Sequence, residues 1–185
     1  MPAHIWEGPA NNKIGFVLST PGEEEGNADR PAAGATGDNM DAILKHLNAW
    51  NPVIFSSSDR YQYLITNAST KIMYARKDGG KTQDLDSNIT TITNVERLKT
   101  ELAKCEVVIL CGDKAHLLEQ HMIGKIVVKT PHLGNIGLHN EYNNRHSSLK
   151  GINEGKQRDV IRRRLCADNI IGQLKEPLTI KSPNK

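Results

Sequence analysis

Aromatic residues and cysteines are both scarce in this sequence. Aromatic side chains make up 4% of the 185 residues, and the 3 cysteines are Cys105, Cys111 and Cys166. An odd number of cysteines without paired spacing argues against a disulfide framework, and three thiolates are too few for an ordinary iron–sulfur cluster. We therefore expect no metal cluster, and we expect a reducing cytoplasm as the compartment.

The sequence also lacks a long apolar run and a recognisable targeting segment. No stretch reaches the roughly 18 apolar residues of a membrane-spanning helix. The segment from Met1 to Lys13 has no basic region followed by an apolar one, which a secretory signal would have. With 37% hydrophobic and 24% charged residues, the composition is typical of a globular domain without a membrane partner. We expect a monomer that needs no cofactor.

Basic residues only slightly outnumber acidic ones. The 24 Lys and Arg against 21 Asp and Glu give a net charge of +3, which fits a nucleic-acid partner without requiring one. Arg158, Arg162, Arg163 and Arg164 crowd one late segment. This segment is either part of a DNA-binding surface or the solvated face of a helix.

Short apolar runs alternate with segments of helical periodicity. The runs predict strands over residues 14–18, 61–67, 106–111 and 126–128. Helices are predicted to begin near Asp38, at a Thr93–Glu96 capping box, near residue 115 and at residue 155, whereas residues 23–37 and 77–88 predict loops. This order predicts an α/β fold, a three-layer α/β/α sandwich around a mostly parallel four-stranded sheet. We expect a single domain over residues 1–174 and a loose tail over 175–185.

Polar motifs follow the ends of the predicted strands, where ligands bind in parallel sheets. The first strand ends in Leu18-Ser19-Thr20-Pro21-Gly22, with Glu25 and then Arg30-Pro31-Ala32-Ala33-Gly34 downstream. The second ends in Ile65-Thr66-Asn67, and the third runs into Gly112-Asp113-Lys114-Ala115. The fourth leads into Thr130-Pro131-His132-Leu133-Gly134-Asn135.

In this order, over about Ile14 to His139, these motifs resemble those of the uracil-DNA glycosylase superfamily. The resemblance implies that a nucleotide is swung out of the DNA helix into a pocket whose carboxamide, here Asn67, reads the base edge. The implied substrate-binding residues are Ser19, Thr20, Pro21, Gly22, Ala32 and Asn67. His132 would donate a hydrogen bond to the departing base, and Glu25 or Asp38 would stabilise the sugar cation or position a water.

The same resemblance implies a DNA-contacting loop after the fourth strand. In the family this loop carries a residue that fills the hole left by the extruded base, a part that Leu133, Ile136 or Leu138 could take here. Core packing is at least as good an explanation for any one of these three. The implied DNA-binding residues are Arg30, Leu133, Gly134, Asn135, Ile136, Arg162 and Arg163.

Three departures from the family bear on the substrate. Ser19 and Thr20 stand where relatives carry a Glu or Asn, so the usual water-activating group is missing. His132-Leu133-Gly134 replaces His-Pro-Ser, and Ala32 replaces the Phe that stacks on uracil. Because the loss of this ring leaves a larger, less stacked pocket, we hypothesise an excised base larger than uracil. Similar anti-phage glycosylases remove glucosylated hydroxymethylcytosine and leave abasic sites.

Other interpretations remain open at this point. The chain could be a catalytically inactive DNA-binding module of the same fold, a uracil-specific repair glycosylase, or an unrelated enzyme acting on a nucleotide or sugar. Gly80-Lys81-Thr82 resembles the end of a P-loop, but Ala75 stands where the upstream glycine is required. His132, His139 and His146 recur every seven residues, which is no usual zinc-ligand pattern.

Overall fold

A five-stranded, mostly parallel sheet forms the centre of the molecule. The computed structural model describes residues 2–9 and 13–180, with side chains up to Lys175. The strands lie in the order β1-β3-β2-β4-β5, and all neighbours are parallel except β1 and β3. Their bounds are β1 Ile5–Trp6, β2 Ile14–Leu18, β3 Leu64–Asn67, β4 Val107–Cys111 and β5 Ile126–Thr130. The predicted α/β class is confirmed.

The expected number of strands is wrong, because β1 was missed. This edge strand has two residues, which is too short for an alternating pattern to be visible in the sequence. It pairs antiparallel with β3, Ile5 opposite Thr66 and Trp6 opposite Ile65. The start of the second predicted strand is also corrected, since Arg60–Gln62 forms a 3-10 turn and β3 begins at Leu64.

Seven α-helices connect and cover the strands among the residues that the structure describes. They are α1 Glu23–Ala28, α2 Ala35–Trp50, α3 Asp86–Ile89, α4 Ile92–Glu101, α5 Asp113–His116, α6 Asn135–Glu141 and α7 Gly155–Ile180. Both predicted loops contain a short helix, α1 and α3 respectively. None of the helices so described is long and apolar enough to cross a membrane.

Two helix starts differ from the sequence prediction. Helix α2 begins at Ala35, with Gly34 as its N-cap, so Asp38 lies inside the first turn. Helix α4 is capped by Thr91, whose hydroxyl accepts from the Asn94 N–H at 3.4 Å, and the expected Thr93–Glu96 capping box is absent. At the other end of the chain, α7 continues past the predicted end at residue 174 to Ile180, and residues 181–185 lie outside the described residues.

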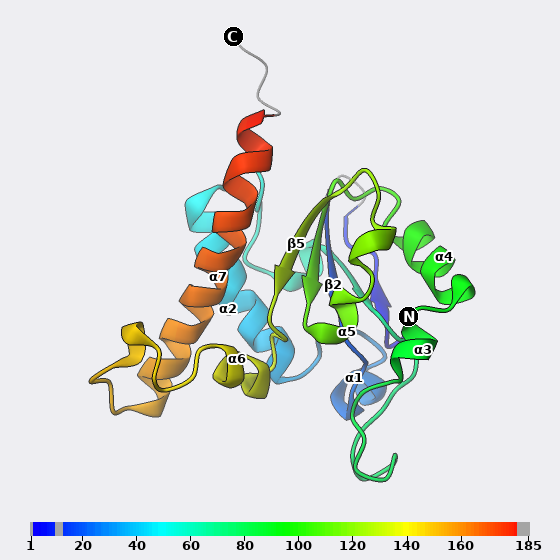
Figure 1. Ribbon diagram of the computed structural model, residues 1–185, viewed down its shortest axis with the longest axis horizontal. Helices are drawn as coiled ribbons and strands as arrows, with labels where there is room; N and C mark the ends of the chain where they lie inside the picture. Colours follow the sequence, from blue (N-terminus) through cyan, green and yellow to red (C-terminus); the bar gives the residue numbers. More distant parts are fainter. Residues whose placement is uncertain (1, 10–12, 181–185) are drawn as a thin grey trace.

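Helices pack on both faces of the sheet, each over its own hydrophobic core. Alternate residues of a strand face opposite sides, so Phe16 and Ile109 lie in one core, whereas Val17 and Leu110 lie in the other. The first core is closed by α2 and α7, which run side by side in Figure 1, and the second by α4 and α5. The carboxyl ends of β2, β3, β4 and β5 are left to the connecting segments that form the candidate site.

Candidate functional site

A cavity of about 840 Å³ opens at the carboxyl ends of the parallel strands. Every parallel strand end contributes to its lining: Leu18 from β2 and Ser19 directly after it, Asn67 from β3, Gly112 after β4, and Thr130 from β5. Of the residues predicted from the sequence, the structure brings together seven at this cavity: Ser19, Thr20, Gly22, Glu25, Asn67, His132 and Ile136. The volume lies toward the upper end of the roughly 300–1,000 Å³ of small-molecule sites.

His132 is enclosed by backbone that only glycine permits. A Cβ placed on Gly112 would lie 3.0 Å from the His132 Cβ and 3.1 Å from the Ser19 Oγ. Gly112 also has a φ of +88°, a conformation that L side chains rarely adopt. A Cβ on Gly137 would lie 2.2 Å from the His132 carbonyl oxygen. The ends of β2, β4 and β5 therefore touch one another around this histidine.

The hydrogen bonding of His132 fixes its tautomer. Nδ1 accepts a hydrogen bond from the Gly134 N–H at 3.0 Å, so in the neutral ring the proton resides on Nε2. Burial lowers the pKa of His132, and the nearby carboxylates of Glu25 and Asp113 offset this only in part. The side chain therefore offers an uncharged N–H donor at neutral pH.

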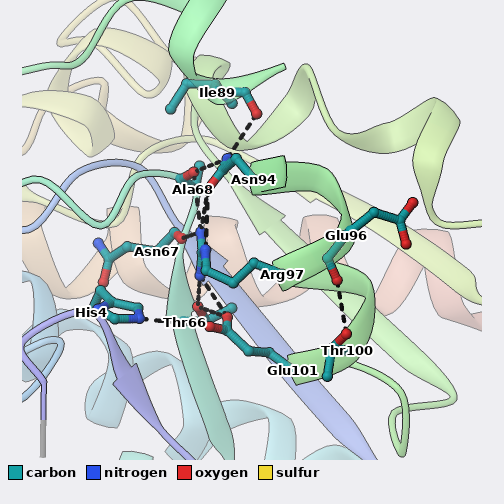
Figure 2. Close-up of polar contacts among 10 residues, drawn as sticks. All are labelled: His4, Thr66, Asn67, Ala68, Ile89, Asn94, Glu96, Arg97, Thr100 and Glu101. Atoms are coloured by element: carbon teal, nitrogen blue, oxygen red, sulfur yellow. Dashed lines mark hydrogen bonds and ion pairs between the residues drawn. The ribbon is translucent and has the colours of Figure 1, made fainter. Parts of the chain in front are cut away.

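Both backbone polar groups of Asn67 are hydrogen-bonded, and Figure 2 shows the contact with Arg97. The Asn67 N–H donates to the His4 carbonyl at 2.9 Å, and the Asn67 carbonyl accepts from Arg97 Nη2 at 2.9 Å. The neighbouring Ala68 carbonyl accepts from Asn94 Nδ2 at 2.8 Å. Arg97 is held in turn by Glu101, 2.6 Å from Nη1. Helix α4 thus holds the backbone at the end of β3 through Arg97 and Asn94.

The Asn67 side chain contrasts with this backbone. The residue is 2% exposed and lines the cavity. Its Oδ1 atom is buried and has no hydrogen-bond partner among the described residues. A buried carbonyl oxygen without a donor is costly, so this side chain is suited to accept from a bound molecule.

One wall of the cavity comes from the connection between β3 and α3, residues 68–85, which contributes Met73, Tyr74, Thr82 and Gln83. The sequence predicts a loop over residues 77–88, which overlaps this connection. Its anchor is Asp84, 6% exposed, whose Oδ2 accepts from Ser69 Oγ at 2.7 Å and whose N–H donates to Thr20 Oγ1 at 3.2 Å. Burial alone would raise the pKa of Asp84, but hydrogen bonds from Ser69, Asn88 and the Leu85 N–H, with the charge of Lys71, lower it.

Two of the carboxylates at the cavity face His132. Glu25 is one, although its Oε2 also accepts from the Gly22 N–H at 3.0 Å and caps α1. Asp113, the first residue of α5, is the other, and it has no hydrogen bond or ion pair within residues 2–9 and 13–175. Sequence reasoning missed Asp113, although its place directly after a buried strand and Gly112 was a signal. Asp38 lies elsewhere, with a side chain 78% exposed and 3.9 Å from Arg60.

Two of the predicted substrate-binding residues do not line the cavity. Ala32 is 0% exposed and belongs to the core under α2. Its φ of 53° is left-handed, which turns the methyl group inward, so the missing phenyl ring does not itself account for the size of the cavity. Pro21 is buried beside the cavity, and its carbonyl accepts from the Met73 N–H at 2.9 Å.

The predicted DNA-binding loop is the start of helix α6, where a flexible loop was expected. Gly134 is the N-cap, and Asn135 and Ile136 form the first turn. Leu133 is 1% exposed and Leu138 is 2% exposed, whereas Ile136 is 79% exposed at the cavity. Of the three candidates for an apolar wedge, Ile136 alone is exposed.

The predicted arginines lie outside the cavity lining. Arg162 is 3% exposed, and its guanidinium bonds to Tyr142, Asp159, Asn144 and His139, so it joins α6 to α7 instead of reaching outward. Arg163 donates to Asn39 Oδ1 at 2.7 Å, and Asn39 Nδ2 donates to the Leu133 carbonyl at 2.8 Å. Arg30 is exposed and stacks on the Tyr61 ring, 4.9 Å from its centroid.

Comparison with known proteins gives this chain no family. No protein-family model matches it, and no curated protein matches it significantly.

The described residues contain no group of three or more His, Cys, Asp or Glu side chains that could hold a metal ion. The histidines that recur every seven residues are engaged separately. His139 Nε2 lies 2.9 Å from Asp159, and the His146 ring packs against Tyr142. What the cavity does offer is a neutral donor at His132, carboxylates at Glu25 and Asp113, and an unpaired acceptor at Asn67.

Proposed function

We propose that this chain is a DNA glycosylase with the three-layer fold of the uracil-DNA glycosylase superfamily. It would extrude a modified base bulkier than uracil, such as the glucosylated hydroxymethylcytosine of phage DNA, and leave an abasic site. The observation that carries the proposal is that Asn67, His132 and the carboxylates of Glu25 and Asp113 line one cavity at four strand ends. Its volume of about 840 Å³ supports a base with a large substituent.

The chemistry follows from the residues at the cavity. When the bond between C1′ and the base breaks, its electron pair leaves with the base and positive charge develops on the sugar. The Nε2–H of His132 stabilises the departing anion, a kind of contact worth about 10²- to 10³-fold in rate elsewhere. The oxygen of a water molecule bonds to C1′, one water proton passes to the Asp113 or Glu25 carboxylate, and the base takes up a proton.

Contact with DNA is assigned to the first turn of α6. An exposed Ile136 beside the cavity suits insertion into the base stack, where it would fill the space of the extruded nucleotide. Lys114 and Lys129 also line the cavity, and each is paired with a carboxylate, Asp86 and Glu119 respectively. The paired carboxylates therefore reduce the attraction of these lysines for DNA phosphates.

A panel of duplexes tests the proposal. Purified protein is incubated with duplexes that carry uracil, hypoxanthine or glucosylated hydroxymethylcytosine, and abasic sites are read out by strand cleavage in alkali. We expect cleavage of the glucosylated duplex and its loss in His132→Ala and Asn67→Ala. Strong release of uracil with none of the bulky base would make this a uracil-specific repair enzyme and defeat the enlarged-pocket proposal.

One observation favours a second candidate, a DNA-binding module without catalysis. Ser19 Oγ donates to the Cys111 carbonyl at 3.3 Å, and Thr20 Oγ1 accepts from the Asp84 N–H at 3.2 Å. Both hydroxyls at the position of the family's Glu or Asn are thus committed to the fold, and neither activates water. Retention of modified DNA in a gel-shift assay without any alkali-sensitive site would establish this candidate.

A further inference from the structure

Two residues that line the same cavity each carry an unpaired side-chain oxygen. Asn67 Oδ1 and Gln83 Oε1 are both buried, and neither has a hydrogen-bond partner among the residues that the structure describes. Both residues line the cavity, one at the end of β3 and the other on the connection from β3 to α3. The segment that separates Asn67 from Gln83 in the sequence leaves the carboxyl ends of the strands and returns to them.

Gln83 stands on a fixed part of that segment. Its neighbour Asp84 is bonded to Ser69, Asn88 and Thr20, and Met73 is held by the Pro21 carbonyl. The segment is therefore pinned to the ends of β2 and β3 on both sides of the cavity wall. Because the backbone next to Gln83 is well anchored, a displaced segment does not explain its unpaired Oε1 atom. The atom is unpaired because no donor among the described residues lies opposite it.

Two buried acceptors need a ligand with two donors. Uracil in DNA presents a single N–H, at N3, and can therefore satisfy one of them. The other lining groups beside Gln83, Thr82 and Tyr74, add a hydroxyl and an aromatic ring. A base that carries a hydroxyl-bearing substituent supplies both the ring-edge donor and the second donor.

We infer that Gln83 is a specificity-determining residue that accepts a hydrogen bond from a hydroxyl group on the substituent of the excised base, while Asn67 accepts from the ring edge. This inference rests on the proposed glycosylase function and names the substrate class of that same cavity. The connection between β3 and α3 is then the element that discriminates substituted bases from unsubstituted uracil.

Three variants test this role in single-turnover base release. Gln83→Leu removes the acceptor, Gln83→Glu keeps an acceptor, and Gln120→Leu is a matched control on the exposed turn Glu119–His121. The substrates are duplexes with uracil, 5-hydroxymethyluracil, which differs from uracil by one hydroxymethyl group, and glucosylated hydroxymethylcytosine. We expect Gln83→Leu to slow release of the hydroxyl-bearing bases by about tenfold or more, with uracil changed less than about twofold.

The remaining outcomes separate the inference from the function on which it rests. Gln83→Glu and Gln120→Leu should retain release of the hydroxyl-bearing bases. The Tm of Gln83→Leu should stay level or rise, because an unpaired buried oxygen is removed. Equal slowing on uracil, no slowing on the hydroxyl-bearing bases, or a lowered Tm would overturn the role of Gln83 and leave the glycosylase proposal standing. A wild-type protein that releases no base from any duplex would overturn both.

Discussion

The polar side chains on the two sides of the cavity differ in how they are hydrogen-bonded. On the His132 side, the ring nitrogen Nδ1 is paired with the Gly134 N–H, and glycine backbones enclose the ring. On the Asn67 side, the backbone is equally well paired, but the side-chain oxygens of Asn67 and Gln83 have no donor among the described residues. The His132 ring is thus held in place before any ligand binds, whereas the two buried oxygens on the Asn67 side gain a donor only when a ligand binds.

This difference assigns separate tasks to the two sides. A preorganised donor such as His132 acts on charge as it develops and needs no rearrangement during the reaction. Unpaired acceptors such as Asn67 Oδ1 instead lower the stability of the empty protein. The protein regains this stability when a bound ligand donates hydrogen bonds to them. Substitutions on the first side should therefore change the rate of the chemical step, and substitutions on the second side should change which base is bound.

The largest effect is expected for His132→Ala. Loss of the Nε2–H donor should slow base release at saturating protein by about 10²- to 10³-fold, measured in single turnover on the best duplex of the panel. His46→Ala, on α2 and outside the cavity lining, is the matched control. A His132→Ala rate within threefold of the wild type would remove His132 from the chemistry.

Carboxylate substitutions should come next. Asp113→Asn is expected to slow base release by about 100-fold, because a residue that accepts a proton from water typically contributes at least this much. Glu25→Gln should have a smaller effect, since one oxygen already caps α1. Asp38→Asn should leave the rate unchanged, because the side chain lies away from the cavity. A loss in Asp38→Asn that exceeds the loss in Asp113→Asn would favour the prediction made from sequence alone.

Arg97→Met tests the support behind Asn67. Removing the guanidinium takes the Arg97 ion pair from Glu101, which keeps His4 and the Thr66 hydroxyl, and frees the Asn67 carbonyl. We expect the free energy of unfolding in urea to fall by about 2–3 kcal/mol. The double variant Arg97→Met with Glu101→Leu should recover much of this stability without recovering tight binding of the modified base. Recovery of both properties would show that Arg97 supports the fold alone.

The smallest effect is the dependence on pH. Because burial lowers the pKa of His132 in the folded protein, the folded state binds fewer protons than the unfolded one. The contribution to stability is present above the ordinary value of about 6.5 and is lost as the pH falls through the lowered pKa. Protonation also ends the hydrogen bond to Gly134. Release rates should hold from neutral pH to below the ordinary value of about 6.5 and decline as the pH approaches the lowered pKa of His132, and a rate that rises on acidification would contradict a neutral donor.

The ends of the strands could be predicted from the sequence, but the cavity wall formed by residues 68–85 could not. Asn67 and His132 could be placed because buried strands are visible as apolar runs, and parallel strands end at one edge of the sheet. Gln83 and Asp84 could not be placed, because a polar connection has no periodicity and its course depends on long-range bonds to Ser69 and Thr20.

Two further residues show why motif positions alone were insufficient. Ala32 occupies a motif position, yet a left-handed backbone turns its methyl group into the core. Arg162 belongs to a basic cluster, yet its guanidinium is buried among partners from α6 and the following loop. Side-chain direction depends on tertiary packing, which a count of like residues along the chain does not contain.

The proposed function requires that this cavity receives an extruded base. Its most direct test is a crystal structure with a duplex that holds a glucosylated hydroxymethylcytosine on a 2′-fluoro sugar, which resists cleavage. We expect the base between Asn67 and His132, with ligand donors at hydrogen-bond distance from the Asn67 and Gln83 side-chain oxygens. A base that remains stacked in the duplex, or DNA bound on another face while the cavity stays unchanged, would contradict it.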